Sequence, residues 1–502
     1  MRSADPPSGN WAGKLVFILL LGLIVSIPVA LVASDYFQSP TTRALSYMAD
    51  DGWCTASIEG LGVHCFGDFQ GGRIVAEHDF GMPSTSSPVL RISNAMGPMG
   101  PVPASLLNEY PIDQSRKYSS LYPPLSQFPH VVTAMVRNSA AGPLGALLGY
   151  MGLLIACALF PAAWLAWQRR RRGAAALWPL LLLGVTAVPV IAMVDRGNSA
   201  AFALPCLAVF AVFLGRSPTW VAPTAAFAAA LVRPQWILLA LGLAAIGQLR
   251  VAARVIVAFL GVTAMSFVLM PGGPWPAVSE WLSGTAYTTR GGPADASPVN
   301  LSASRSLYVV GDALLTLPGA FGAAGGALQE WVVAQPVVPG LVVAALVAVV
   351  VVIFRRRIPK AYVLVLALVT PAVVPATSPI YYLQFALVLA ALQLGLSGQS
   401  IGYEQVTRPA ARPWWPWLVT TAIALSIVPL PLAPAADTPF GWGRNSFVLE
   451  NIGLIWLLVL AVTLCLSVLS RSTGKAKSPL LSPADEDHSE LGEELRPPVP
   501  QP

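Results

Sequence analysis

The sequence predicts an all-α membrane protein that crosses the bilayer many times. Of its 502 residues, 55% are hydrophobic and only 11% are charged, whereas soluble domains carry about 25% charged residues. The apolar residues form long runs, and arginines cluster directly after several of these runs, as at Arg169 to Arg172 and Arg355 to Arg357. Such clusters are typical of cytoplasmic loops. We therefore interpret the net charge of +6 as a topology signal and expect no nucleic-acid partner.

The first span is expected at residues 16–33, because this apolar run follows Arg2 and Lys14. Basic residues before a span favour a cytoplasmic N-terminus. The run is longer than the core of a signal peptide, so a retained span is favoured over a cleaved one. Residues 35–140 are rich in Pro, Gly and Ser. They are expected to form an extracytoplasmic loop, far longer than an ordinary connection.

The remaining apolar runs alternate in direction according to the basic clusters between them. They are expected at 144–167, 174–194, 200–214, 220–232, 236–248, 255–270, 337–354, 361–376, 380–396, 417–432 and 452–469. With the first span they give about twelve crossings, with both termini in the cytoplasm. The runs 220–232 and 236–248 are shorter than the roughly 20 residues of a full crossing, and they meet at Arg233-Pro234. Short, proline-interrupted pairs are typical of sites built from helix ends.

A second extracytoplasmic loop is expected over residues 271–335. Trp275, Trp281 and Trp331 are placed in it like anchors at the membrane interface. Its apolar, glycine-rich stretch 307–328 is interpreted as either a re-entrant or a surface helix. Residues 1–470 would then form one multi-pass domain. The charged, proline-rich residues 471–502 would form a disordered cytoplasmic tail.

Two of the five cysteines, Cys54 and Cys65, lie in the polar first loop. In an oxidising compartment such a pair would close a short loop, with a stabilisation of about 2–3 kcal/mol; two free thiols are the alternative. The other three, Cys157, Cys206 and Cys465, lie in apolar runs and are expected to be inert packing residues. No second Cys/His pair accompanies His64 and Cys65, so no metal ligand is assigned.

The unusual polar residues of this chain fall on one side of the membrane, opposite the arginine clusters. We expect a site there, formed by Asp35, Tyr122, Asp195, Arg196, Arg233, Asn300, Arg305, Tyr381 and Tyr382. Asp35 ends the first span and is a candidate general base, although it also fits a charge that simply faces water. Asp50-Asp51, in the polar loop, is the competing carboxylate pair.

Arg233 is the sharpest candidate for binding a ligand. A permanently charged guanidinium between two half-length apolar segments requires an anion or a carboxylate. Phosphate suits its forked geometry, and an ion pair with a neighbour such as Asp195 is the alternative. Asp195-Arg196 would itself form an ion pair at a helix end. The turn Tyr122-Pro123-Pro124 would lay an aromatic ring against a sugar.

In chain order, these motifs resemble the polyprenyl-phosphate-sugar-dependent glycosyltransferases of family 87, which have the GT-C fold. The resemblance covers residues 14–396, and it rests on order and spacing more than on any single motif. The motifs are Asp35-Tyr36, Tyr122-Pro123-Pro124, Asp195-Arg196-Gly197-Asn198, Val232-Arg233-Pro234, Asn300-Leu301-Ser302-Ala303-Ser304-Arg305 and Ser378-Pro379.

The resemblance implies that Asp35 is the catalytic base and that Arg233 contacts the donor phosphate, where the family often has lysine. It places Tyr122 and residues 300–305 at the rim of the pocket. The sequence departs from the family at Tyr381-Tyr382, where members often carry two histidines, and at the charged turn Asp195-Arg196. The first loop is also longer. These departures bear on which acceptor and which sugar the protein would use.

We therefore expect a cell-membrane glycosyltransferase whose active site faces the extracytoplasmic side. It would transfer a hexose, with mannose favoured, from a polyprenyl phosphate to an envelope glycolipid or glycan, with inversion and without a cofactor. Decaprenyl-phosphate arabinose is the alternative donor. A flippase for lipid-linked sugars is the alternative of another class. Such a transporter would usually show internal repeats, and we find no convincing repeat in this sequence.

Overall fold

The computed structural model describes the chain over residues 11–36, 122–137, 142–170, 173, 177–270, 272–290, 300–355, 357–395, 414–428 and 451–469. Within these ranges the chain is helical. The only pairing of extended backbone described there is an isolated bridge between Asn300 and Pro379. The all-α prediction is therefore confirmed for this part of the chain.

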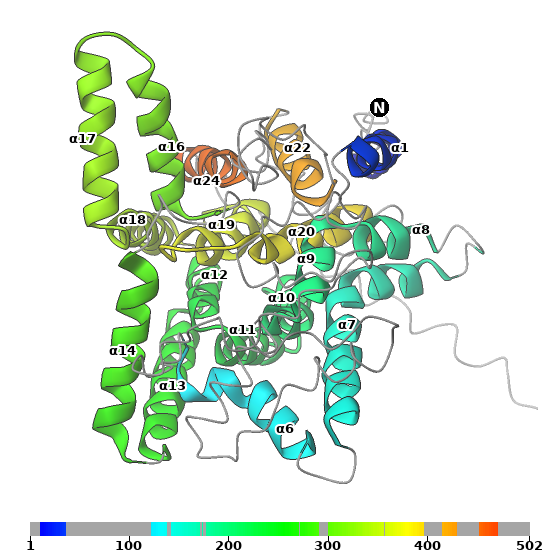
Figure 1. The fold of residues 1–502 in the computed structure, drawn as a ribbon, viewed down its shortest axis with the longest axis vertical. Helices are drawn as coiled ribbons and strands as arrows, with labels where there is room; N and C mark the ends of the chain where they lie inside the picture. Colours follow the sequence, from blue (N-terminus) through cyan, green and yellow to red (C-terminus); the bar gives the residue numbers. More distant parts are fainter. Residues whose placement is uncertain are drawn as a thin grey trace, which may run out of the picture.

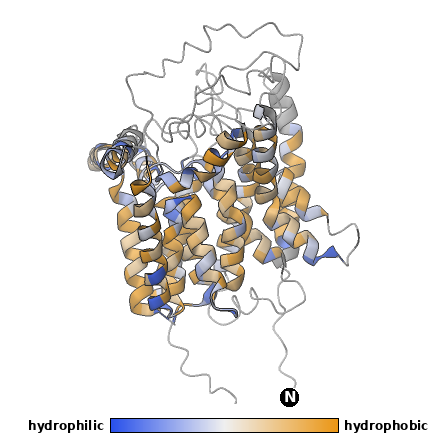
Figure 2. Ribbon diagram, turned by 90° about the horizontal axis from the view of Figure 1, so that it is seen from below, coloured by the Kyte–Doolittle hydropathy of each residue, from blue (hydrophilic) through white to orange (hydrophobic). Residues whose placement is uncertain are grey.

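Most of the described α-helices pack side by side in a bundle (Figure 1). They are α1 (Trp11–Tyr36), α7 (Gly142–Gln168), α9 (Val188–Arg196), α10 (Leu204–Phe213), α11 (Val221–Val232), α12 (Ala240–Ala245), α13 (Leu249–Val268), α18 (Val338–Phe354), α19 (Lys360–Val373), α20 (Gln384–Gly395), α22 (Trp415–Ile427) and α24 (Ile452–Leu469). Apolar residues dominate these helices where Figure 2 shows them lengthwise.

Short turns and outer helices complete the described fold. The short helical turns are η1 (Pro124–Gln127), α8 (Trp178–Leu180), η3 (Leu181–Val185), η4 (Ser199–Ala203), η5 (Pro234–Leu239) and η6 (Ile380–Leu383). Four further helices are α6 (Phe128–Arg137), α14 (Pro274–Arg290), α16 (Ala303–Leu315) and α17 (Ala320–Ala334).

Among the described residues, three helices are long and apolar enough to cross a bilayer: Gly145–Gln168 within α7, then α13 and α24. A fourth candidate combines α17 and α18, which are bent by 88° at a short break. The other apolar helices of the bundle are shorter, because irregular turns such as η4, η5 and η6 interrupt them. These findings are compatible with a helical membrane protein, and the number of twelve crossings stays a prediction.

The stretch expected as one span at 174–194 is broken in the structure. Its described part forms α8, the wider π-helical turn η3 and then α9. Prolines stand in the first turn of both α8 and α9, at Pro179 and Pro189. Proline donates no backbone hydrogen bond, and its ring clashes with the preceding turn of a continuous helix. This explains why the apolar run does not continue as one helix.

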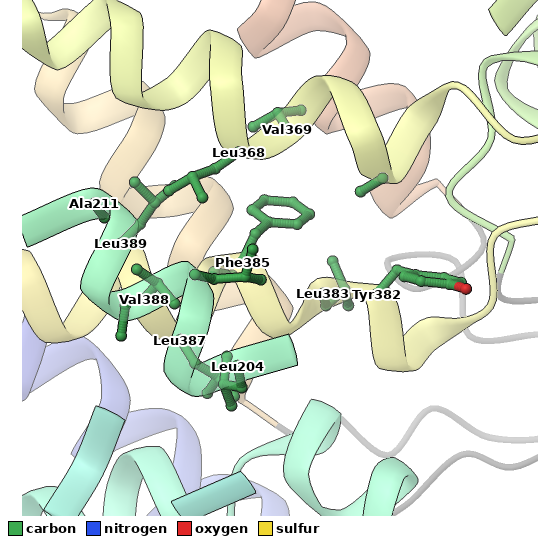
Figure 3. Packing of buried hydrophobic residues seen from close by; sticks show 14 of the residues in the cluster. Leu204, Ala211, Leu368, Val369, Tyr382, Leu383, Phe385, Leu387, Val388 and Leu389 are labelled. Atoms are coloured by element: carbon green, nitrogen blue, oxygen red, sulfur yellow. The ribbon is translucent and has the colours of Figure 1, made fainter. Parts of the chain in front are cut away.

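The core of the bundle is formed around α19 and α20. Figure 3 shows Phe385 of α20 packed among Leu204 of α10 and Leu368 and Val369 of α19. Trp456 of α24 meets the Phe385 ring edge-on, with 4.7 Å between ring centroids. By contrast, the outer helices α13 and α18 expose large apolar side chains, among them Val257, Leu260 and Ile353. An apolar surface of this kind is typical of helices that face lipid.

The helix ends gather at two opposite ends of the bundle. At one end, which we call the basic end, Arg169 after α7 donates to the carbonyl of Leu394 in the last turn of α20. There too, Lys360 at the start of α19 donates to the carbonyl of Gly215, 3.5 Å away. Followed from there, α19 leads to η6, and α10 and α11 connect to η4 and η5. We call this opposite end the junction end.

Candidate functional site

Arg233 lies at the break between α11 and η5. Its backbone is extended, with φ −142° and ψ 112°, and Pro234 begins the next turn. A proline restricts the preceding residue to extended conformations, so the sequence Arg233-Pro234 itself ends α11 here. The Arg233 side chain is only 4% exposed. A permanent charge is thus buried at the junction end of an apolar bundle.

Two neutral groups orient the Arg233 guanidinium. Its Nη2 donates to Oδ1 of Asn198, 2.7 Å away. Its Cζ lies 4.1 Å from the centroid of the Tyr122 ring, within the range of a cation–π contact. A hydrogen bond holds one edge of the guanidinium while the ring covers its face. Together these contacts hold the Arg233 guanidinium in one orientation.

Asn198 is itself held by the turn between α9 and η4. Its Oδ1 also accepts from the backbone N–H of Ala200, at 2.8 Å, and so caps η4. Gly197, just before it, adopts the left-handed conformation with φ 64°, which glycine reaches without steric cost. The Gly-Asn pair therefore serves a local purpose, because it turns the chain and places the amide beside Arg233.

A layer of aromatic residues supports this turn from outside. The Tyr150 hydroxyl of α7 donates to the carbonyl of Gly197, at 2.9 Å. The Tyr150 ring stacks on His130 of α6 and meets Phe202 of η4 edge-on, each with 5.4 Å between centroids. Sequence reasoning assigned no role to His130 or Tyr150. One signal was present, since a tyrosine inside an apolar helix requires a partner for its hydroxyl.

Three tyrosines continue the site from Arg233 towards η6. The hydroxyls of Tyr122 and Tyr382 lie 3.3 Å apart, with either one as donor. The Tyr381 and Tyr382 rings have centroids 5.0 Å apart. Figure 3 shows Tyr382 at the edge of the apolar cluster, with its hydroxyl directed away from Phe385. Ser126 fastens the adjoining turn η1 by donating to the carbonyl of Leu231, at 2.9 Å.

Asn300 joins the start of α16 to the segment before η6. Its Oδ1 accepts from the backbone N–H groups of Ser302, at 3.0 Å, and Ser378, at 2.8 Å. Leu301 N–H donates to the Ser378 carbonyl at 2.8 Å. Ser302 then caps α16 by accepting from the backbone N–H of Arg305. One buried amide thereby fixes two segments that are distant in sequence.

The structure brings Tyr122, Arg233, Tyr381 and Tyr382 together, with Asn300 on the adjoining segment. Two other predicted residues lie on neighbouring elements. Arg196 ends α9 just before the Gly197 turn. Arg305 lies in the first turn of α16, with its guanidinium 5.5 Å from the Tyr308 ring. These positions describe an arrangement, and the chemical roles of the residues stay predictions.

Several predicted residues are only partly described or lie outside the described ranges. Asp35 belongs to the last turn of α1, and Asp195 to the last turn of α9. The side chains of both carboxylates lie outside the description, and so do Cys54 and Cys65 entirely. The structure therefore leaves the proposed base and the proposed disulfide as predictions.

We predict that Cys54 and Cys65 form a disulfide in protein from intact, oxidised membranes. They share a polar loop that we expect, from the positions of the arginine clusters, to lie on the extracytoplasmic side, where disulfides persist. Mass spectrometry of non-reduced peptides should detect the linked pair, and reduction should release both peptides. Cys465 serves as the internal control, because it is expected to remain a free thiol. Two alkylatable thiols at Cys54 and Cys65 would contradict the prediction.

Two buried polar groups beside the tyrosines have no hydrogen-bond partner among the described residues. They are the hydroxyl of Ser378 and the whole side-chain amide of Gln384. Both residues are fully buried. Native proteins rarely leave such groups unsatisfied without an explanation, such as a bound molecule. Gln384 was not among the predicted site residues, and its place directly after η6 makes it a further candidate for ligand contact.

Within the described ranges, no group of three or more His, Cys, Asp or Glu side chains is placed to hold a metal ion. What this end offers is a buried guanidinium, aromatic rings, and hydroxyl and amide groups. Such a set can bind an anion next to a flat, partly apolar ligand.

No protein-family model matches the chain, and no curated protein or solved structure matches it significantly. The likeness to the family 87 glycosyltransferases therefore rests on the sequence motifs and their order.

Proposed function

We propose that this protein is a membrane glycosyltransferase of the GT-C fold, with about twelve spans. It would transfer mannose from a polyprenyl-phosphate donor to a glycolipid or glycan of the cell envelope, on the extracytoplasmic face of the cell membrane. The observation that carries this proposal is the buried Arg233, oriented by Asn198 and Tyr122. A guanidinium held in one direction is well suited to a phosphate, which it can bind through two parallel hydrogen bonds.

The reaction would be a single displacement at the anomeric carbon. An acceptor hydroxyl attacks that carbon as the bond to the donor phosphate oxygen breaks, and the attack from the opposite face inverts the configuration. Asp35 takes the proton from the attacking hydroxyl. The polyprenyl phosphate leaves with an additional negative charge, which Arg233 stabilises. Arg196 and Arg305 are further candidates for that charge.

The aromatic residues would select and orient the sugar. Tyr122 lies between Arg233 and Tyr382, so a phosphate on Arg233 would place the attached sugar beside this pair of hydroxyls. The Tyr381 ring adds a flat apolar surface next to it. A tyrosine offers both a ring face and a hydroxyl, and these two groups match the apolar face and the hydroxyl edge of a sugar.

The decisive experiment is a transfer assay with purified, reconstituted protein. Radiolabelled decaprenyl-phosphate mannose and decaprenyl-phosphate arabinose are supplied separately, with membrane glycolipid as acceptor. We expect label to pass from the mannose donor to the glycolipid. Transfer from the arabinose donor alone would reassign the sugar. Movement of the intact donor across the vesicle membrane without transfer would support a flippase and contradict the proposal.

We predict that Asn198 is a positioning residue for donor binding. Removing its amide in Asn198→Ala frees one edge of Arg233, and a hydrogen bond to a charged group contributes about 1.5–3 kcal/mol. Donor KM should therefore rise by roughly 10–100-fold, with a smaller effect on kcat. Tyr150→Phe removes the hydrogen bond to Gly197, one step further from Arg233, and should raise donor KM less.

The matched control is Ser266→Ala on the outer helix α13, which also deletes one side-chain hydrogen bond, the one that the Ser266 hydroxyl donates to the Thr263 carbonyl of the same helix. It should leave donor KM unchanged. If Asn198→Ala and Ser266→Ala behave alike in the transfer assay, then Asn198 has no part in positioning Arg233.

A further inference from the structure

The helices α16 and α17 form a closely packed hairpin that extends beyond the bundle (Figure 1). Glycines lie where the two backbones approach each other. A Cβ atom added to Gly325 would lie 2.6 Å from the carbonyl oxygen of Gly311, and one added to Gly311 would lie 3.0 Å from that of Gly325. No side chain fits between the helices there. The two helices therefore pack closely along this line, and α16 also contacts α18 and α24. The side of α17 that faces away from α16 is left for other contacts.

The hairpin lies across the direction of the bundle. The axis of α17 is bent by 88° from that of α18. Figure 1 shows α18 and α24 nearly end-on, while α16 and α17 run lengthwise across the view. The residues of α18, from Val338 to Phe354, are almost all apolar. Such a composition suits a helix directed through the bilayer. If α18 is so directed, the hairpin runs parallel to the membrane surface.

The base of the hairpin is fixed at the junction end. The Asn300 side chain and the Leu301 N–H tie the start of α16 to Ser378. The Ser304 hydroxyl donates to the carbonyl of Pro336, which follows α17. The segment before α16 and the segment after α17 are thus both held beside the tyrosines of the site, where the helices of the bundle end. A re-entrant helix would instead have to turn back towards the middle of the bundle.

One face of α17 is apolar and exposed. Positions three, four and seven residues apart share a helix face, so Phe321, Ala324, Leu328 and Trp331 form one stripe, which we call the apolar stripe. Phe321 is 63% exposed and Trp331 42%. The exposed Glu330 lies on another side, about 100° around the helix from Trp331. The buried Gly325 and Val332 lie on the side next to the stripe.

We propose that the α16–α17 hairpin lies flat in the lipid–water boundary, with the apolar stripe of α17 turned to the acyl chains. The same lipid that would cover the exposed apolar residues of α18, such as Leu341 and Leu346, would continue onto the stripe. Tryptophan is enriched at this boundary, and helices with one apolar face bind there. The proposal rests on the membrane location of the protein and is independent of sugar transfer.

Depth-dependent fluorescence quenching in the reconstituted full chain tests this arrangement. Phe321→Cys and Leu328→Cys place an environment-sensitive fluorophore on the stripe, and Glu330→Cys places it on another side of the same helix. The unsubstituted chain, labelled in parallel, gives the background from its own cysteines. The vesicles contain lipid spin-labelled either high on the acyl chain or near the bilayer centre.

We expect blue-shifted emission from both stripe positions, with quenching by the shallow spin label that is several-fold stronger than for Glu330→Cys. Quenching by the deep label should be weak. Stronger quenching by the deep label would establish a re-entrant hairpin and overturn the proposal. Water-like emission from the stripe, equal to that of Glu330→Cys, would also overturn it. A blue shift that appears only when a second copy of the chain is present in the vesicle would overturn it too, because the stripe would then contact protein instead of lipid.

Leu317→Cys, in the turn between the helices, serves as a second probe if a stripe variant fails to fold. Leu317 is exposed and does not belong to the core cluster of the bundle. A flat hairpin places it at the same shallow depth as the stripe, whereas a re-entrant hairpin places it deepest of all the labelled positions. The two arrangements therefore give opposite results with the deep spin label.

Discussion

Asp35→Asn is expected to fold, insert and bind the donor, and yet to transfer almost no sugar. Asparagine keeps the shape and the hydrogen-bonding capacity of the aspartate, but it cannot accept the proton of the attacking hydroxyl. Loss of a general base typically lowers the rate by about 10²–10⁴-fold. The measurement is the initial rate of transfer at matched expression, together with donor binding by the same preparation.

Asp50→Asn and Asp51→Asn are the matched controls, because they make the same chemical change in the polar loop. Both should stay largely active if these carboxylates are only solvated. Near-normal turnover by Asp35→Asn would remove Asp35 from the mechanism. Loss of activity in Asp51→Asn alone would move the base into the loop. Neither outcome bears on the proposed phosphate site at Arg233, because donor binding is measured separately.

Arg233→Ala is expected to raise the donor KM by roughly 10–100-fold, because hydrogen bonds to charged groups contribute about 1.5–3 kcal/mol. Arg233→Lys should keep part of the binding, since it preserves the charge but loses the forked geometry. Arg233→Met keeps much of the length without the charge, and it separates loss of charge from loss of packing. The measurement is the dependence of transfer rate on donor concentration for each variant.

Arg216→Ala provides the control for removing an arginine elsewhere. Arg216 lies between α10 and α11 at the basic end, away from the tyrosines. The Arg216→Ala variant should leave the donor KM unchanged.

If Arg233→Ala binds the donor as well as the unsubstituted protein, then Arg233 is a structural residue that holds Asn198 and Tyr122 in place. Reduced thermal stability with unchanged KM would be the corresponding observation.

Local features of the fold were predictable from the sequence. The expected run 452–469 coincides with α24, and the break at Arg233-Pro234 appears where proline forbids a continuous helix. These features depend on hydropathy and on backbone chemistry within a few residues. The broken helix at 174–194 was missed, because the prediction followed the hydropathy of the run and gave no weight to the backbone effect of Pro179 and Pro189.

The contacts that build the candidate site were less predictable, because they join residues that are far apart in the chain. The sequence drew attention to Arg233 and Tyr122 through unusual residue types, yet it did not indicate that Asn198 would hold the guanidinium. His130 and Tyr150 carried no local signal beyond their polarity. A hydrogen bond such as that of Tyr150 to Gly197 depends on how α7 packs against α9, which hydropathy does not encode.

The pairing of Asn300 with Ser378 also sets an order of events during synthesis. The two residues are 78 positions apart, and α16, α17, α18 and α19 all lie between them. The contacts among Tyr122, Asn198 and Arg233 involve only residues that leave the ribosome earlier. The part of the junction end around Arg233 can therefore assemble while the segment from Asn300 to Ser378 is still being synthesised. The Asn300 amide can acquire its Ser378 partner only after α19 has emerged, so closure of this end belongs to a late stage of biogenesis.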